Sequence, residues 1–284
     1  MNNAIELSHV TKTYPTFALR DLSLTLPTGC IMGLVGENGA GKSTTLRLIM
    51  NTIDRDSGEI TVLGQDNRSD AFRELKNDIG VVLDEAYFPE VLNPRQVGQV
   101  MAQTYTRWDE ATYAGYVDRF ALPWKQRFKD FSRGMKMKLA IAVALSHSPR
   151  LLLLDEATSG LDPMIRDEIL ETFSEFTRDE NHSVLLSSHI VSDLEKICDY
   201  IAFLHRGRLV LCEEKDALLD GCAIVKCTRA QLSDLPEEAV LGMEQSPYGV
   251  RALVRRELVS PVFSPERPTL EDIILFLAKG EEQR

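Results

Sequence analysis

Residues 36–44 contain the most specific chemical signal in the sequence. They read Gly-Glu-Asn-Gly-Ala-Gly-Lys-Ser-Thr and fit the pattern G-x-x-x-x-G-K-[ST], in which backbone N–H groups curl around phosphates at a helix N-terminus. In such a loop, Lys42 would reach the β- and γ-phosphates and the Ser43 hydroxyl would ligate Mg²⁺. The residues predicted to contact a nucleotide are Gly36, Asn38, Gly39, Gly41, Lys42, Ser43 and Thr44.

Two acidic residues follow an apolar run at residues 151–154, which consists of four leucines. Such a run predicts a buried strand. At its end, Asp155 would hold Mg²⁺ through the water shell of the ion, and Glu156 could polarise the attacking water. The sequence therefore predicts both a nucleotide site and the groups needed to hydrolyse the nucleotide.

Two other polar residues are expected at the ends of buried strands. The apolar segment 78–83 ends in Asp84, and segment 183–187 leads to His189. In an open α/β sheet, ligands bind at the carboxyl ends of the strands. Asp84 could instead only solvate the start of a loop, and a lone histidine is usually structural. The position of His189 favours contact with the γ-phosphate.

The elements around these residues predict an α/β fold. A strand over residues 30–35 precedes the glycine-rich loop and a helix over 44–50 follows it. Residues 5–10 and 19–26 alternate like strands, and between them Tyr14 could cover a core edge or stack on a nucleotide base.

Beyond residue 89 the pattern becomes helical, over 94–106 and 110–120. Val97, Val100 and Met101 are predicted to share the buried face of the first helix. The aromatic residues concentrated here are interpreted as core for the most part, although a docking surface is an alternative for some. Ser132 is a good N-cap for the helix predicted over 134–146.

Composition excludes several classes of protein. The chain has 284 residues, 44% hydrophobic and 26% charged, and no apolar run near the roughly 18 residues that a membrane span needs. The net charge of −11 disfavours a nucleic-acid partner, which requires clustered Lys and Arg. The five cysteines form no CxxC pair, which is consistent with a reducing cytoplasmic setting.

In their order and spacing, these motifs resemble the ATP-binding subunit of an ABC transporter over residues 5–219. Residues 36–44 match Walker A, residues 151–155 match Walker B and residues 159–162 match the D-loop. The resemblance implies roles for four further residues: Tyr14 as the adenine-stacking aromatic, Glu156 as the catalytic glutamate, Asp162 as the D-loop aspartate, and His189 as the switch histidine.

The sequence departs from the common family pattern in two places. Phe-Ser-Arg-Gly-Met at residues 131–135 replaces Leu-Ser-Gly-Gly-Gln, so that Ser132 and Gly134 survive while Arg133 and Met135 differ. Asp84 stands where the family has the Q-loop glutamine, and a carboxylate is at least as good a ligand for Mg²⁺. Both variants resemble those in an exporter branch that handles drugs, antibiotics or peptides.

The resemblance implies an α/β fold with a P-loop NTPase core and an N-terminal antiparallel β subdomain. A helical insertion at about residues 84–148 would carry the signature motif. The ATPase domain is predicted to cover residues 1–219 and a small C-terminal α+β appendage residues 220–284, where strands over 223–227 and 250–254 and a helix over 269–277 are expected.

The function implied is ATP binding and hydrolysis that powers a separate membrane permease, with ATP and Mg²⁺ as cofactors. The partners would be the permease, gripped by the insertion, and a second ATPase subunit, for which a homodimer is favoured over a heterodimer. The chain would then be cytoplasmic, held at the inner face of the cell membrane through the permease. Two alternatives stay open: a soluble ATPase acting on nucleic acid or ribosomes, and a regulatory module without turnover.

Overall fold

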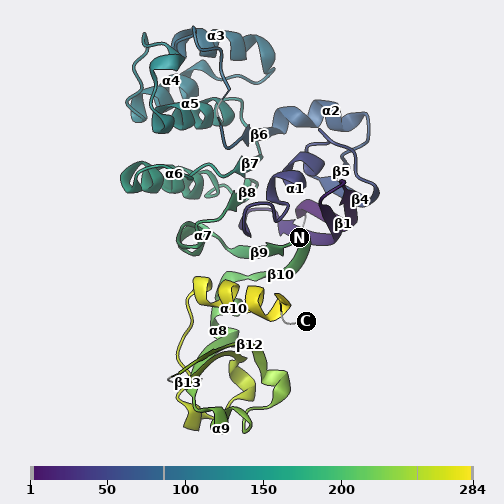
Figure 1. Cartoon of the computed structure of the whole chain (residues 1–284). Helices are drawn as coiled ribbons and strands as arrows, with labels where there is room; N and C mark the ends of the chain where they lie inside the picture. Colours follow the sequence, from purple (N-terminus) through teal and green to yellow (C-terminus); the bar gives the residue numbers. More distant parts are fainter. Residues whose placement is uncertain (1–2, 86, 248, 283–284) are drawn as a thin grey trace.

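The computed structural model describes residues 3–85, 87–247 and 249–282, so the ends of the predicted ATPase domain and appendage, residues 1–2 and 283–284, lie outside the described residues. A six-stranded sheet in the order β10-β9-β3-β8-β7-β6 forms the centre of the molecule (Figure 1). The strands β3, β6, β7, β8 and β9 are parallel, and β10 pairs antiparallel with β9. Their bounds are β3 (Ile31–Val35), β6 (Ile79–Val82), β7 (Leu151–Asp155), β8 (Ser183–Ser188), β9 (Tyr200–His205) and β10 (Arg208–Glu214).

The parallel strands of this sheet are largely buried, because parallel sheets are covered on both faces. Every residue of β3, β7 and β8 is buried. Among the helices that stand between these strands along the chain are α1 (Lys42–Ile49), α2 (Ala71–Leu75), α6 (Pro163–Phe176) and α7 (Val191–Ile197).

A second, antiparallel sheet lies beside α1, in the order β2-β1-β4-β5 (Figure 1). It consists of β1 (Asn3–Thr13), β2 (Ala18–Pro27), β4 (Ser57–Val62) and β5 (Gln65–Asp66). The alternation predicted for β2 is confirmed, since Leu22, Leu24 and Leu26 are all buried in one cluster that includes α1.

The helical insertion lies at the end of the molecule opposite the C-terminal region (Figure 1). It contains α3 (Pro94–Thr104), α4 (Glu110–Arg119) and α5 (Arg133–Leu145). The expectation that Val100 faces the core is wrong, because this side chain is 46% exposed while Val97 is fully buried. The aromatic residues are core, as predicted for most of them: Tyr113 is fully buried, its hydroxyl donating to the Pro94 carbonyl (2.7 Å), and Tyr105, Trp108, Tyr116 and Trp124 pack against the same cluster.

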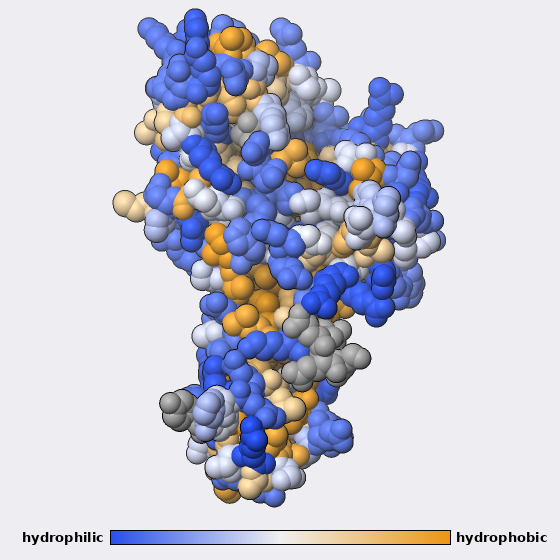
Figure 2. Space-filling view, viewed as in Figure 1, coloured by the Kyte–Doolittle hydropathy of each residue, from blue (hydrophilic) through white to orange (hydrophobic). Residues whose placement is uncertain are grey.

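The C-terminal region is a three-stranded antiparallel sheet of order β11-β13-β12 with a helix on it. Its elements are α8 (Lys215–Gly221), β11 (Cys222–Cys227), α9 (Arg229–Leu232), β12 (Val240–Ser246), β13 (Gly249–Arg255) and α10 (Leu270–Glu282). Helix α10 lies between this sheet and the central sheet (Figure 1), and the Leu270 N–H donates to Glu195 in α7 (3.3 Å). Figure 2 shows apolar surface gathered at the narrow part of the molecule where these two regions meet.

The predicted fold class is confirmed, with a parallel sheet, an antiparallel β subdomain, a helical insertion and a small α+β region at the C-terminus. The boundary predicted at residue 220 falls inside α8, and the division into two domains stays a prediction. None of the helices in the described part of the chain combines the length and apolar character needed to cross a lipid bilayer.

Candidate nucleotide site

A cavity of about 530 Å³ opens where β3 ends and α1 begins. The residues that line it come from four separate segments of the chain: Thr16, Phe17, Glu37, Asn38, Gly39, Gly41, Lys42, Ser43, Thr44, Asp84 and Glu156. The fold therefore brings Asp84 and Glu156 to the glycine-rich loop, as the predicted meeting of strand ends requires.

The loop needs glycine for its shape. Gly39 and Gly41 have φ values of +85° and +114°, which side chains with a Cβ rarely adopt. A Cβ on Gly36 would lie 2.4 Å from the Leu204 carbonyl oxygen. The loop wraps around Lys42, whose Nζ donates to the carbonyls of Gly36 (2.7 Å) and Glu37 (3.3 Å). A loop closed around a buried cation at a helix N-terminus has the donor set that phosphate requires.

Glu156 lies between Lys42 and His189. Its Oε1 is 3.1 Å from Lys42 Nζ, a contact that is an ion pair rather than an aligned hydrogen bond. Its Oε2 is 2.6 Å from Nδ1 of His189. Glu156 also has a left-handed backbone (φ +51°), a strained conformation for a residue with a side chain. The turn thus directs the carboxylate toward the loop and the histidine at the same time.

Ser187 connects the two acidic residues, a link that the sequence reasoning missed. Its hydroxyl donates to Asp155 Oδ1 (2.6 Å) and accepts from the Glu156 N–H (3.2 Å). Because β8 pairs with β7 in the register Asp155↔Ser187, a polar residue at the end of β8 was the signal that could have revealed it. The bond fixes the Asp155 carboxylate, which is only 5% exposed.

The predicted Mg²⁺ ligands are Ser43, Asp84 and Asp155. Ser43 and Asp84 line the cavity, while Asp155 is the last residue of β7 and immediately precedes Glu156 in the chain. No cluster of three or more His, Cys, Asp or Glu side chains able to hold a metal occurs among the described residues. This donor set suits Mg²⁺, which usually binds one or two protein oxygens together with waters and substrate phosphates.

Phe17, and not Tyr14, supplies the aromatic ring that lines the cavity. Tyr14 is 38% exposed and stacks behind Phe17, with ring centroids 6.4 Å apart. The adenine-stacking role of Tyr14 stays a prediction, and Phe17 is a candidate that the sequence analysis passed over. Its signal was an aromatic residue in the same turn.

Ser132, Gly134 and Asp162 lie away from this cavity in the same chain. Ser132 caps α5 by accepting from the Met135 N–H (3.3 Å), and Asp162 caps α6 by accepting from the Ile165 N–H (3.1 Å). Gly134 packs against the Ile165 side chain, since a Cβ at this position would lie 2.8 Å from Ile165 Cδ1. The structure therefore gives each residue a local role within one chain.

Arg133, the unusual residue of the signature segment, packs on Gly160. A Cβ on Gly160 would lie 2.9 Å from an Arg133 guanidinium nitrogen, and the φ of Gly160 is +68°. Arg133 thus covers the turn that follows β7 in the same chain. The signature segment and the D-loop segment are therefore in contact through Arg133.

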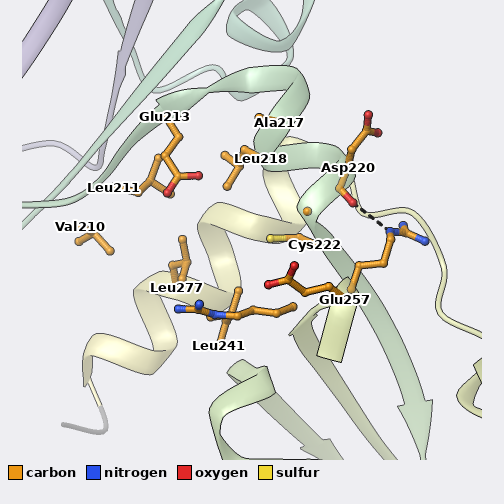
Figure 3. Close-up of a pocket in the computed structure, with 13 residues that line it drawn as sticks. Val210, Leu211, Glu213, Ala217, Leu218, Asp220, Cys222, Leu241, Glu257 and Leu277 are labelled. Atoms are coloured by element: carbon orange, nitrogen blue, oxygen red, sulfur yellow. Dashed lines mark hydrogen bonds between the residues drawn. The ribbon is translucent and has the colours of Figure 1, made fainter. Parts of the chain in front are cut away.

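A larger cavity, of about 660 Å³, lies at the junction of β10 and α8 with the C-terminal region (Figure 3). Apolar residues such as Leu218 and Leu277 form its walls, and Glu213 and Glu257 are among its charged groups (Figure 3). It has neither a glycine-rich loop nor a lysine among its lining residues. Chemistry therefore assigns the nucleotide to the smaller cavity.

The parallel sheet, the loop and helix at the end of its central strand, and the acidic end of β7 define a P-loop nucleotide-binding protein. The family model described as ABC transporter matches residues 19–159. The lantibiotic transport ATP-binding protein SrtF of Streptococcus pyogenes is 33% identical over 215 residues, which cover 75% of this chain and 91% of that protein. The Nod factor export ATP-binding protein I of Rhizobium leguminosarum bv. viciae is 31% identical over 99% of this chain and 96% of its own length.

A solved structure of an ATP-binding subunit of an ABC transporter superposes with a TM-score of 0.69 at 27% identity, covering 76% of this chain and 92% of that one. The chain belongs to the family of ABC transporter ATP-binding proteins. It is an ATPase of the transporter class, which confirms the predicted family and activity.

Proposed function

We propose that the chain powers the export of a drug, antibiotic or peptide through a separate permease. The single observation that carries the catalytic part is the placement of Glu156 between Lys42 and His189 (3.1 and 2.6 Å). The export direction is supported by the relative named for Nod factor export. The class of compound is supported by the relative named for lantibiotic transport, and by a bacitracin transport ATP-binding protein of Enterococcus faecalis that is 32% identical over 74% of this chain and 69% of that protein.

Lys42 and the loop N–H groups would hold the phosphates of ATP, with Ser43, Asp84 and Asp155 near the ion that accompanies them. When bound, Mg²⁺ neutralises charge on the phosphate oxygens. Ser187 would keep the Asp155 carboxylate in one orientation, since its hydroxyl already donates to it. This arrangement would place the nucleotide with its γ-phosphate toward Glu156.

Glu156 would take the proton from the attacking water, and His189 would orient the carboxylate and contact the γ-phosphate. General-base catalysis of this kind contributes roughly 10²–10⁴-fold to a rate. The two side chains lie within hydrogen-bond distance of each other. His189 would therefore also help to position a water molecule bound next to Glu156. Because Ser132 and Asp162 lie away from the cavity, a second ATPase subunit would complete the site, and we favour a second copy of this chain.

The permease would dock on the helical insertion and on the segment that leads into it. Four large apolar side chains are exposed there: Leu83 (45%), Tyr87 (74%), Val91 (66%) and Val100 (46%). Exposed apolar groups that gather in one region mark an interaction site more often than scattered ones do. Through this contact the chain would be held at the inner face of the cell membrane.

Recovery of the chain with detergent-solubilised membranes, combined with phosphate release, tests the proposal. The double variant Tyr87→Ser, Val91→Ser should lose recovery with membranes while its basal ATPase activity stays within about twofold, because neither residue lines the nucleotide cavity. Val262→Ser is the matched control, since Val262 is 88% exposed but lies in the C-terminal region, away from the insertion. Membrane recovery that is equal in all three proteins would contradict the docking surface.

A further inference from the structure

The turn that follows Glu156 and the helix that follows His189 are joined by a pair of charges, of which the carboxylate is buried. Arg166 lies in the first turn of α6, and its Nη2 donates to the Leu161 carbonyl (3.2 Å). Its Nη1 lies 3.8 Å from Oδ1 of Asp193, in the first turn of α7. One guanidinium therefore contacts both the segment that leads away from Glu156 and the segment that leads away from His189.

Asp193 is unusual for an acidic residue in the first turn of a helix, because its side chain is buried and only 4% exposed. Burial raises the pKa of Asp193, and the nearby Arg166 guanidinium counteracts this shift. A carboxylate is kept in such a place only where a partner compensates for lost hydration. The compensating partner here is Arg166, whose side chain is 25% exposed.

The network has unused hydrogen-bonding capacity. In the described part of the chain, Arg166 Nε, Asp193 Oδ2 and Thr158 Oγ1 are buried without a hydrogen-bond partner. Buried polar atoms of this kind are rare in folded proteins and call for an explanation. A shift of about 1 Å would convert the 3.8 Å contact into a two-pronged arginine–carboxylate pair, which forms at about 2.8 Å.

We infer that Arg166 and Asp193 are positioning residues for hydrolysis: they hold the turn at residues 158–162 against α7 and thereby fix Glu156 and His189 relative to each other. The inference deepens the proposed function and rests on it. Neither residue lines the nucleotide cavity, so ATP binding does not depend on the pair. The contact between Glu156 and His189, in contrast, depends on Arg166 and Asp193. Glu156 precedes the turn that Arg166 holds, and His189 precedes the helix that carries Asp193.

Four variants test the inference. Arg166→Met removes the guanidinium and keeps a side chain of similar length. Asp193→Asn removes the negative charge and keeps the size of the side chain. Arg166→Lys keeps the positive charge but loses the planar guanidinium that can donate two parallel hydrogen bonds. Asp167→Asn is the matched control, because Asp167 pairs with Lys196 across the same two helices at 2.9 Å but on the surface. Turnover, KM for ATP, affinity for a fluorescent ATP analogue and unfolding temperature are measured for each.

Arg166→Met and Asp193→Asn should lower kcat about 10- to 100-fold, the cost of misplacing reacting groups by about 1 Å, with KM and analogue affinity changed by less than about twofold. Arg166→Lys should be intermediate and Asp167→Asn unchanged. In a Glu156→Gln background, neither Arg166→Met nor Asp193→Asn should reduce kcat further, because residues that act through one another are not additive.

Normal kcat in Asp193→Asn with a lowered unfolding temperature would overturn the inference and leave the pair with a structural role only. Losses that multiply with Glu156→Gln would also overturn it. If Arg166→Met does not fold, Asp193→Asn decides, since it keeps the volume of the buried side chain. A wild-type protein that binds the analogue but releases no phosphate would instead contradict the proposed function and the inference together.

Discussion

Lys42 Nζ lies 3.1 Å from Glu156 Oε1, so the cation of the phosphate loop is already paired with the carboxylate beside it. Both side chains are largely buried, at 6% and 15% exposure, which strengthens their attraction relative to a surface pair. An incoming phosphate must therefore compete with Glu156 for Lys42. This relationship connects the group proposed for chemistry with the group proposed for binding.

Glu156→Gln should lower turnover by roughly 10²–10⁴-fold and leave ATP affinity equal or higher. The amide cannot accept a proton from water, and it no longer competes as a charge for Lys42. Phosphate release and equilibrium binding of ATP measure the two effects. Glu59→Gln, an exposed glutamate on β4, serves as control. Near-normal hydrolysis in Glu156→Gln would remove this residue from the role of base.

Lys42→Ala should weaken ATP binding at least about tenfold, equivalent to about 1.4 kcal/mol. The variant loses the charge held toward the phosphates and also the two bonds by which Lys42 closes the loop on Gly36 and Glu37. The measurement is the dissociation constant, compared with Lys226→Ala in the C-terminal sheet. A normal dissociation constant with reduced turnover would mean that Lys42 acts in the chemical step alone.

The two aromatic residues of the turn before β2 can be separated by substitution. If the base stacks on this pair, Phe17→Ala should weaken ATP binding about 2- to 10-fold, since an aromatic contact contributes about 0.5–1.5 kcal/mol. Tyr14→Ala should weaken binding too, while Tyr14→Phe retains it, because the ring face supplies the contact. If Tyr14→Ala binds ATP as the parent does and Phe17→Ala does not, Phe17 is the stacking residue and Tyr14 only supports it.

Specific activity should rise with protein concentration, because Ser132 and Asp162 do not line the cavity of their own chain. The N–H groups at the start of α5 would reach a phosphate only from a second chain. Mixing a Lys42→Ala protein with a Ser132→Arg protein should restore activity that neither has alone. Activity per molecule that stays constant on dilution to demonstrably monomeric protein would contradict a shared site.

Stability should fall in mild acid partly because of His147. Its side chain is buried, stacks on Tyr105 with centroids 4.0 Å apart, and has Nδ1 3.0 Å from the Asn77 carbonyl. Burial lowers its pKa below the ordinary value of 6.5. Below pH 6.5 the unfolded chain takes up this proton more readily than the folded one, so stability is complete above pH 6.5 and declines as the pH drops below it.

The unfolding temperature of His147→Gln should therefore change less between pH 7 and pH 5 than that of the parent protein. His9→Gln is the control, because the His9 side chain is 80% exposed. Identical pH slopes in the parent and in His147→Gln would exclude His147 as a source of the acid sensitivity.

The sequence predicted the strands and the loop that form the site because each has a strong local signal. The run of leucines before Asp155 and the glycines of the loop leave few alternatives. Strands β9 and β10, which form one edge of the central sheet, have no comparable local signal. No sequence motif marks their residues, and the place of β9 depends on pairing with β3, which is about 170 residues away in sequence.

Side-chain partners were less predictable than elements. The spacing of α3 suggested that Val100 was buried, yet only tertiary packing decides which part of an apolar face meets the core. Phe17 rather than Tyr14 lines the cavity because the turn between β1 and β2 sets the ring directions. The contact of Arg166 with Asp193 depends on how α6 packs on α7, which no local pattern specifies.

The position of β3 in the middle of the central sheet has a consequence for synthesis of the chain. Its neighbours are β8 and β9, with Ile31 beside Val184 and Met32 beside Tyr200. The strand that carries the phosphate loop is thus made early, whereas both strands that flank it emerge from the ribosome about 150 residues later, a delay of roughly 10–30 s at bacterial or eukaryotic elongation rates. During that interval the apolar strand lacks both of its hydrogen-bonding neighbours, and unpaired strand edges of this kind favour aggregation until β8 and β9 arrive.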